Sequence, residues 1–406
     1  MTWLWANGGV GAALLLAVAC AASGADIPQH FQAALERSPD MAVAEGRLEA
    51  SAARSSGAAR WYKGVPQLGV GILSDALLAD DGYSEQEYEL TTDIWLPGER
   101  LGARREADAA RRLAQVDIEI ARLDIAGQVR DAYWDLVLAE RLLRIAQEAA
   151  RQAAQSHAAV ERLVDARESA PHDLELAGAV LAARQREAAA LAANADSAAA
   201  ALQRFTGIGR SAGVAERRPT DPALESTTEV EAHPLVRRAT AQHDMLVAAT
   251  ARQSRDLGAS PQVAVVMRRE RPLEGAEFDE SIGVRLTVPV GRSADSRVSR
   301  LEVSAAAAAS ARALARQREE VETSIRLARR ALEVAVLGAL LARQQHDALT
   351  RVAAGVDVAY REGGATFLEV QRAREALLDS EREVAGAEIG ADRALSVLLQ
   401  AEGRSP

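Results

Sequence analysis

Long segments with helical periodicity make up most of the chain. Residues 99–166 contain no proline, and apolar residues recur there at intervals of three and four, as at Leu113, Val116 and Ile120. As one helix, this stretch would be about 100 Å long at 1.5 Å per residue, which is too long for an ordinary globular domain. The pattern recurs over residues 292–360. We therefore predict two very long helices.

Each long segment is followed by a break and a shorter helical segment. Pro171 interrupts the first pattern, and residues 172–206 predict a return helix of about half the length. In the second case the turn contains Gly363 and Gly364, and residues 366–401 predict the return helix. The sequence therefore predicts two long helical hairpins.

Two other regions alternate between apolar and polar residues, which is typical of β-strands with one apolar face. We predict β-hairpins over residues 66–97 and 261–290. The residues that share the apolar faces are Leu68, Val70, Ile72, Tyr88, Leu90, Ile94, Leu96, Val263, Val265, Met267, Ile282, Val284, Leu286 and Val288. Each strand has about the 9–11 residues that a tilted strand needs to cross a bilayer.

The two halves of the sequence repeat one another. Pro66-Gln67 recurs as Pro261-Gln262, 195 residues further along, and Leu174-Glu175-Leu176 recurs as Leu368-Glu369-Val370 after 194 residues. So long a period indicates a duplicated structural half rather than a solenoid. We predict two repeats over residues 26–206 and 233–406, each with a first helix, a β-hairpin, a long helix and a return helix. Residues 207–232 link them.

The N-terminal residues 1–25 predict a secretory signal peptide, because residues 8–22 are almost wholly apolar and small residues precede Ala25. Cys20 has two interpretations. It is either the lipidated cysteine of a lipoprotein-like signal or an incidental residue removed with the signal peptide. After residue 25, no continuous apolar run reaches the ~18 residues of a transmembrane helix.

Composition agrees with this pattern and argues against several classes of protein. Only 3% of the residues are aromatic, whereas 26% are charged, and runs of Ala, Arg, Glu and Leu are typical of long helices. The net charge of −10, with interspersed arginine and glutamate, argues against a nucleic-acid-binding protein. The six histidines have no zinc-site spacing, and no nucleotide-binding loop or nucleophile elbow is present. We expect no enzymatic activity, no cofactor and no metal site.

A single chain of this kind would be incomplete. Isolated hairpins leave apolar seams in water, and two strand pairs leave open sheet edges. A ring of several chains would cover both. Three copies of a four-stranded chain would supply a twelve-stranded barrel, and at least two copies are needed for the smallest transmembrane barrels.

The strand-to-helix junctions and the second turn carry a family resemblance. They read Ile94-Trp95-Leu96-Pro97-Gly98-Glu99-Arg100-Leu101-Gly102-Ala103-Arg104, Val288-Pro289-Val290-Gly291-Arg292 and Tyr360-Arg361-Glu362-Gly363-Gly364-Ala365-Thr366-Phe367-Leu368-Glu369-Val370. With these motifs the mature chain resembles the TolC-type outer-membrane factor family, the outer membrane efflux proteins. Its members are the exit ducts of bacterial tripartite efflux pumps and type I secretion systems.

The resemblance implies a mainly α fold with a small β part. Long helical hairpins would form a trimeric α-barrel in the periplasm, and four strands per chain would enter a shared twelve-stranded β-barrel in outer-membrane lipid. It also implies a homotrimer that works with a periplasmic adaptor protein and an inner-membrane pump. The short length and the arginine-rich junction resemble the branch that serves heavy-metal cation pumps of the RND type.

The family's helix turns meet the adaptor, and the matching residues here are Glu168, Ser169, Ala170, Glu362, Gly363 and Gly364. Ser169 stands where the family has glycine. An acidic ring narrows the family's aperture at this end, and the resemblance assigns Glu369 to it, with Glu175 as its first-half equivalent. Arg372 occupies the position of a second acid, so the double ring is not reproduced.

Two interpretations of Glu369 remain. Three copies of Glu369 in a ring would raise some of the carboxyl pKa values and attract a cation. Alternatively, Glu369 and Arg372, three residues apart, form a helix-surface pair worth ~0.2–0.5 kcal/mol.

The predicted function is a passive outer-membrane exit duct for metal cations or small toxic compounds. The alternatives are the outer-membrane component of a type I secretion system and a periplasmic coiled-coil adaptor or scaffold. A charged residue at Val284, on the expected lipid face, would separate a barrel from a scaffold.

Overall fold

The computed structural model describes residues 26–75, 82–209 and 229–406. The predicted signal peptide, Cys20 and most of the linking segment 207–232 lie outside the described residues.

In both halves, initial helical segments are followed by two strands, a long helix and a shorter return helix. The first half contains α1 (Ile27–Arg37), α2 (Pro39–Ala59), β1 (Tyr62–Ser74), β2 (Ser84–Ile94), α3 (Glu99–Asp165) and α4 (Pro171–Thr206). The second contains a short 3-10 helix (Val230–Ala232), α5 (Pro234–Gln253), β3 (Gln262–Arg271), β4 (Asp279–Thr287), α6 (Ala294–Arg361) and α7 (Phe367–Ala401). The predicted fold class, mainly helical with a small β part, is confirmed.

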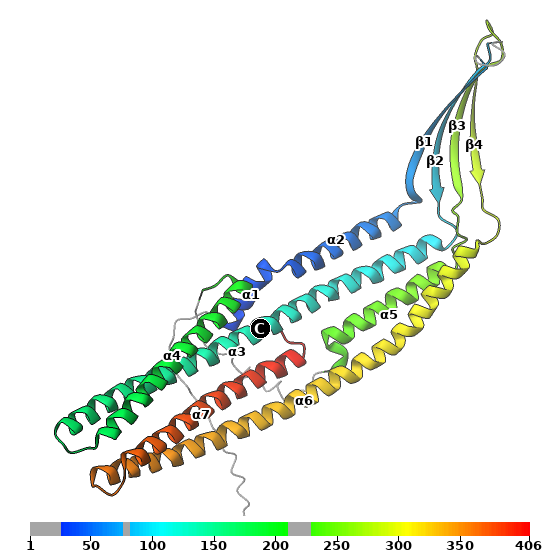
Figure 1. Cartoon of the computed structure of the whole chain (residues 1–406). Coiled ribbons are helices and arrows are strands. Elements are labelled where there is room, and N and C mark those ends of the chain that lie inside the picture. Colours follow the sequence, from blue (N-terminus) through cyan, green and yellow to red (C-terminus); the bar gives the residue numbers. More distant parts are fainter. Residues whose placement is uncertain (1–25, 76–81, 210–228) are drawn as a thin grey trace, which may run out of the picture.

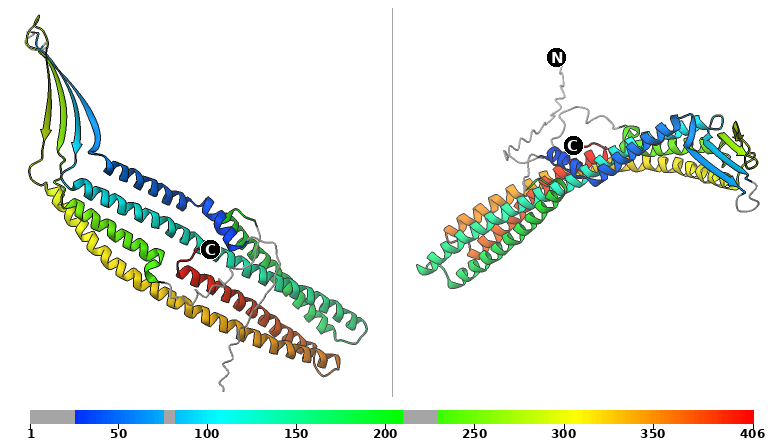
Figure 2. Two further views of the ribbon diagram at one scale, coloured as in Figure 1. Left: turned by 180° about the vertical axis from the view of Figure 1, so that it is seen from behind. Right: turned by 90° about the horizontal axis from the view of Figure 1, so that it is seen from above.

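The molecule is elongated, with the strands at one end and both helix turns at the other (Figure 1). The helices form a curved layer, as the two views of Figure 2 show. The central helix of this layer is α3, which packs on α2, α4, α5 and α7. By contrast, α6 packs mainly on α5 and α7, with a smaller contact to the 3-10 helix, and forms a lateral edge of the layer. None of the described helices has an apolar stretch that could span a bilayer.

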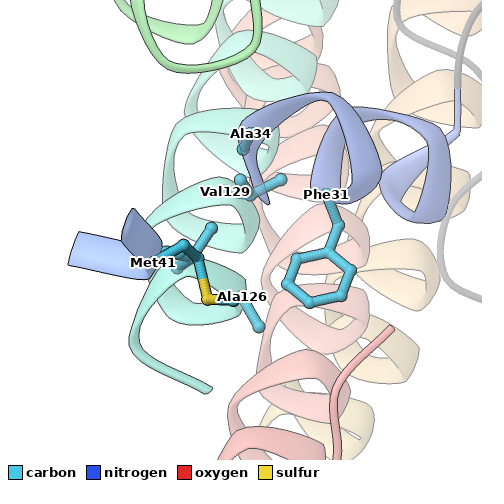
Figure 3. Close-up of a cluster of buried hydrophobic side chains, with 6 residues drawn as sticks. Phe31, Ala34, Met41, Ala126 and Val129 are labelled. Carbon is cyan, nitrogen blue, oxygen red and sulfur yellow. The ribbon is translucent and has the colours of Figure 1, made fainter. Parts of the chain in front are cut away.

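Small apolar clusters hold the layer together at mid-length. In one of them, Phe31 and Ala34 of α1 and Met41 of α2 pack on Ala126 and Val129 of α3 (Figure 3). The break between α1 and α2 lies at Ser38, because Pro39 begins the second helix and the Ser38 hydroxyl accepts the Met41 N–H at 3.4 Å. Alanine permits the close approach of α1 to α3.

Buried polar contacts join the two halves at the same level. The indole N–H of Trp134 in α3 donates to Ser396 Oγ in α7 at 3.0 Å, and both side chains are buried. The buried guanidinium of Arg130 donates to Gln400 Oε1 at 2.6 Å, and the Gln400 amide donates to the Leu123 carbonyl at 2.8 Å. Because a buried donor without an acceptor costs about 1–3 kcal/mol, these bonds fix how α7 sits on α3.

All four strands form one antiparallel sheet in the order β1-β2-β3-β4. The central pairing, β2 with β3, joins the two halves of the chain. In the single chain, β1 and β4 are edge strands.

Candidate functional site

The first helix turn is built by a residue in the left-handed conformation. Arg167, with φ 63°, follows the end of α3, and its N–H donates to the Val164 carbonyl at 2.9 Å. The next N–H, of Glu168, donates to the Leu163 carbonyl at 2.8 Å. This pair of bonds is the Schellman motif, which usually places glycine where Arg167 stands.

The second turn has the same geometry with glycine in place. Gly363 has φ 78° and donates to the Tyr360 carbonyl at 3.1 Å, and Gly364 donates to the Ala359 carbonyl at 2.8 Å. The counterpart of Gly363 is therefore Arg167, and the predicted match of Ser169 to this glycine is displaced by two residues. No glycine is present in the first turn, so nothing in the sequence marked this position.

The first turn of α7 is closed by Glu369. Its Oε2 accepts the Thr366 N–H at 2.7 Å and the Thr366 hydroxyl at 2.9 Å, and the Glu369 N–H donates to Thr366 Oγ1 at 3.3 Å. Hydrogen bonds from Thr366 hold the pKa of the Glu369 carboxyl below its ordinary value. This capping box carries the sequence signature Thr-x-x-Glu, so it could have been found from the sequence.

The remaining predicted aperture residues lie apart from this box. Glu369 is the third residue of α7, and the third residue of α4 is Asp173, which accepts the Ser169 hydroxyl at 2.8 Å. Glu175, the predicted equivalent, lies two residues further on and is exposed. Arg372 is exposed and forms no ion pair with Glu369 among the described residues.

The two turns lie side by side at one end of the molecule (Figure 1). Phe367 is buried against Val160 and Ala177 of the other hairpin, and its ring lies 6.2 Å from that of Tyr360. Around this cluster, Glu168, Glu362, Gly363 and Gly364 are exposed, whereas Ser169 and Ala170 are half-buried. The predicted tip residues thus form one polar end surface supported by a small apolar core.

Ion pairs connect the hairpins above the turns. Arg184 of α4 lies 3.3 Å from Glu375 of α7, and Arg382 of α7 lies 2.5 Å from Glu187 of α4. These pairs could not be predicted from the sequence, because their partners are about 190 positions apart and no local pattern links them.

The sheet at the opposite end has one apolar face. Its rows, read across the four strands, are Leu68-Leu90-Val265-Val284 and Val70-Tyr88-Met267-Ile282. All eight side chains are exposed in the single chain. The predicted placement of Val284 among apolar residues on one face is confirmed by this register.

The other face carries glycine and charged residues. Glu85, Glu87 and Glu89 of β2 lie on it with Arg268 of β3 and Arg285 of β4. Arg268 contacts Glu85 at 2.9 Å and Glu87 at 3.8 Å, and Arg285 contacts Glu87 at 3.5 Å and Glu89 at 3.3 Å. We call this row of five residues the charge ladder.

The sheet, with its apolar face and its charged face, thus lies at the far end of the molecule from the helix turns (Figure 1). Residues 31–208 match the family model of the outer membrane efflux protein. No curated protein sequence matches the chain significantly.

Solved structures share the fold over 93% of this chain. The CmeC outer membrane channel of Campylobacter jejuni is 16% identical, with a TM-score of 0.74 over 85% of its own chain. The outer membrane protein VceC of Vibrio cholerae is 14% identical, with a TM-score of 0.75 over 96% of its chain. The MtrE outer membrane channel of Neisseria gonorrhoeae is 16% identical, with a TM-score of 0.73 over 89% of its chain. The match over residues 31–208 and the shared fold agree with the predicted resemblance to the outer membrane efflux proteins.

Proposed function

We propose that this chain is the outer-membrane exit channel of a tripartite efflux system and that it conducts its substrates passively, without catalysis. The observation that carries this proposal is the two-faced sheet. Its apolar face is exposed, its charged face is opposite, and it lies at the far end of the molecule from the helix turns. An exposed apolar surface of this kind marks a membrane or protein contact.

Closure into a homotrimer would satisfy the open edges of the single chain. The four strands alternate in direction, so β1 and β4 run in opposite directions. The β4 strand of one copy can therefore pair antiparallel with β1 of the next. Three copies would give twelve strands, and closure would remove the unpaired edges. The apolar face would then meet outer-membrane lipid, and the charged face would line the lumen.

The exposed side of α6 supports the same assembly. It carries a stripe of apolar side chains at helical spacing, and its members are Leu327, Val334, Leu337, Leu341 and Val352. Each is more than half exposed in the single chain. Because α6 forms a lateral edge of the helical layer, a neighbouring copy would cover this stripe and continue the layer into an α-barrel.

The helix turns are the proposed contact with a periplasmic adaptor, with an inner-membrane pump of the RND type supplying the energy. The exposed polar end surface at Glu168, Glu362, Gly363 and Gly364 supports this placement. We add Arg167 to the proposed contact residues, because it is exposed in the first turn. Metal cations or small toxic compounds are the proposed substrates, following the resemblance to the heavy-metal branch. The exposed apolar sheet face favours this channel over a periplasmic scaffold.

Glu369 is proposed to line the periplasmic aperture. The side chain is exposed, and its lowered pKa keeps the carboxylate ionised while it caps α7. Glu369→Gln keeps a residue that suits the capping box but removes the charge, and Glu369→Ala removes both. We expect both variants to change the single-channel conductance and its block by cations. A change in Glu369→Ala alone would assign the residue to the cap only.

The function is tested by the native mass of the detergent-extracted protein from the outer-membrane fraction, followed by conductance in a planar bilayer. We expect a trimer that forms discrete channels. A soluble periplasmic monomer or dimer would refute the channel and leave the scaffold.

A further inference from the structure

The charge ladder is continuous across strands that are not neighbours. Arg285 extends from β4 across β3 and reaches Glu87 and Glu89 of β2. This reach is possible because Ala264, the register partner of Arg285 on β3, is small and lies almost completely buried at 3% exposure. The guanidinium therefore lies over the middle of the charged face.

Glu87 connects the two arginines. Its Oε1 faces Arg285 and its Oε2 faces Arg268, while Glu89 also accepts the Thr91 hydroxyl at 3.0 Å. The charges alternate along the ladder in the order Glu85, Arg268, Glu87, Arg285 and Glu89. The arginines thus hold three carboxylates at fixed positions on one face, where the carboxylates would otherwise repel one another.

The charged face as a whole remains acidic. By register, its acids are Glu85, Glu87, Glu89, Asp93, Glu270 and Asp279, and its bases are Lys63, Arg268 and Arg285. The acids therefore outnumber the bases. In a narrow lumen with low-dielectric walls, such an excess raises the local concentration of cations.

We propose that the charge ladder sets the ion selectivity of the pore at the level of the sheet and makes it prefer cations. The inference rests on the proposed channel function. It assigns positively charged solutes as the class that the part of the pore within the sheet favours. Glu87 and Glu89 supply the attracting charge, and Arg285 limits it by neutralising part of it.

The test measures the ratio of K⁺ to Cl⁻ permeability, from the reversal potential of the trimer in a planar bilayer under a KCl gradient. For the wild type we expect a ratio above one. Glu89→Gln should lower it about two-fold, because a unit charge about 8 Å from a passing ion acts through a dielectric constant near that of water. Arg285→Gln should raise it, because two carboxylates lose their cationic partner.

Glu280→Gln is the matched control. Glu280 is on β4 of the same sheet and pairs with Arg269 at 3.3 Å, but its register row places it on the opposite face, with Ile72 and Gln86. The same substitution there should leave the permeability ratio unchanged.

The outcomes separate the inference from the function. Conducting wild-type trimers whose permeability ratio is the same in Glu89→Gln, Arg285→Gln and Glu280→Gln would overturn the inference and leave the channel intact. They would place the selectivity elsewhere along the pore. A wild-type protein that forms no channels would overturn both.

Discussion

A charge placed on the apolar face of the sheet should prevent assembly, whereas the same charge on the adjacent residue should not. Val284 lies in the middle of β4, paired with Val265, and its side chain is 75% exposed in the single chain. Its neighbour Gly283 points to the charged face, in the register row of Glu89. Because Val284 and Gly283 are adjacent, they lie at nearly the same depth in the bilayer of the proposed channel. The same substitution at the two positions therefore compares the two faces of the sheet.

The magnitude follows from the position of each residue. Arginine on the lipid face near the bilayer midplane costs about 2–4 kcal/mol. A trimer carries three copies, so independent sites would lose about 6–12 kcal/mol in all. A side chain added at Gly283 would meet open space, because a Cβ there has no atom within 4 Å, and an arginine would face the acids of β2.

The assay is the fraction of trimer recovered from the outer-membrane fraction, measured by native mass for Val284→Arg, Gly283→Arg and the wild type. We expect Val284→Arg to lose the trimer and Gly283→Arg to retain it. Equal recovery of both variants would refute the assignment of lipid and lumen faces. Loss in Gly283→Arg alone would show that the faces are inverted.

Three further predictions concern stability. Arg167→Gly should raise the midpoint of thermal unfolding, because a non-glycine residue in the left-handed region costs about 1–2 kcal/mol; a lower midpoint would show that the arginine side chain stabilises the turn. Ser396→Ala should lower the free energy of unfolding by about 1–3 kcal/mol in denaturant titrations, because the Trp134 indole N–H loses its acceptor; Ser396→Thr keeps a hydroxyl, and equal losses in the two variants would contradict this reason. Burial lowers the pKa of His233 below its ordinary value of 6.5, so the unfolded chain takes up a proton first and stability is lost as the pH falls below about 6.5. We expect His233→Asn, which retains an N-cap side chain, to lose less stability with acid, and identical pH profiles would count against this role.

The local elements of this protein follow from its sequence. Periodicity is a property of neighbouring residues, so the proline-free segments gave helices whose ends lie within two residues of α3, α4, α6 and α7. The alternation of apolar and polar residues likewise assigned Val284 and its row to one face. The capping box of Glu369 is local as well, and its four-residue signature was present although its role at the helix start was not predicted.

Only the tertiary structure decided which distant residues meet. One local feature was also seen only in the structure: Arg167 takes the left-handed position of the first turn, where no glycine marked it in the sequence. The charge ladder depends on the register of β2, β3 and β4, which brings Arg285 within 3.3 Å of Glu89 across 196 positions of sequence. The bond from Trp134 to Ser396 spans 262 positions. Spacing along the chain carries no information about such pairs, because packing between the halves sets their distances.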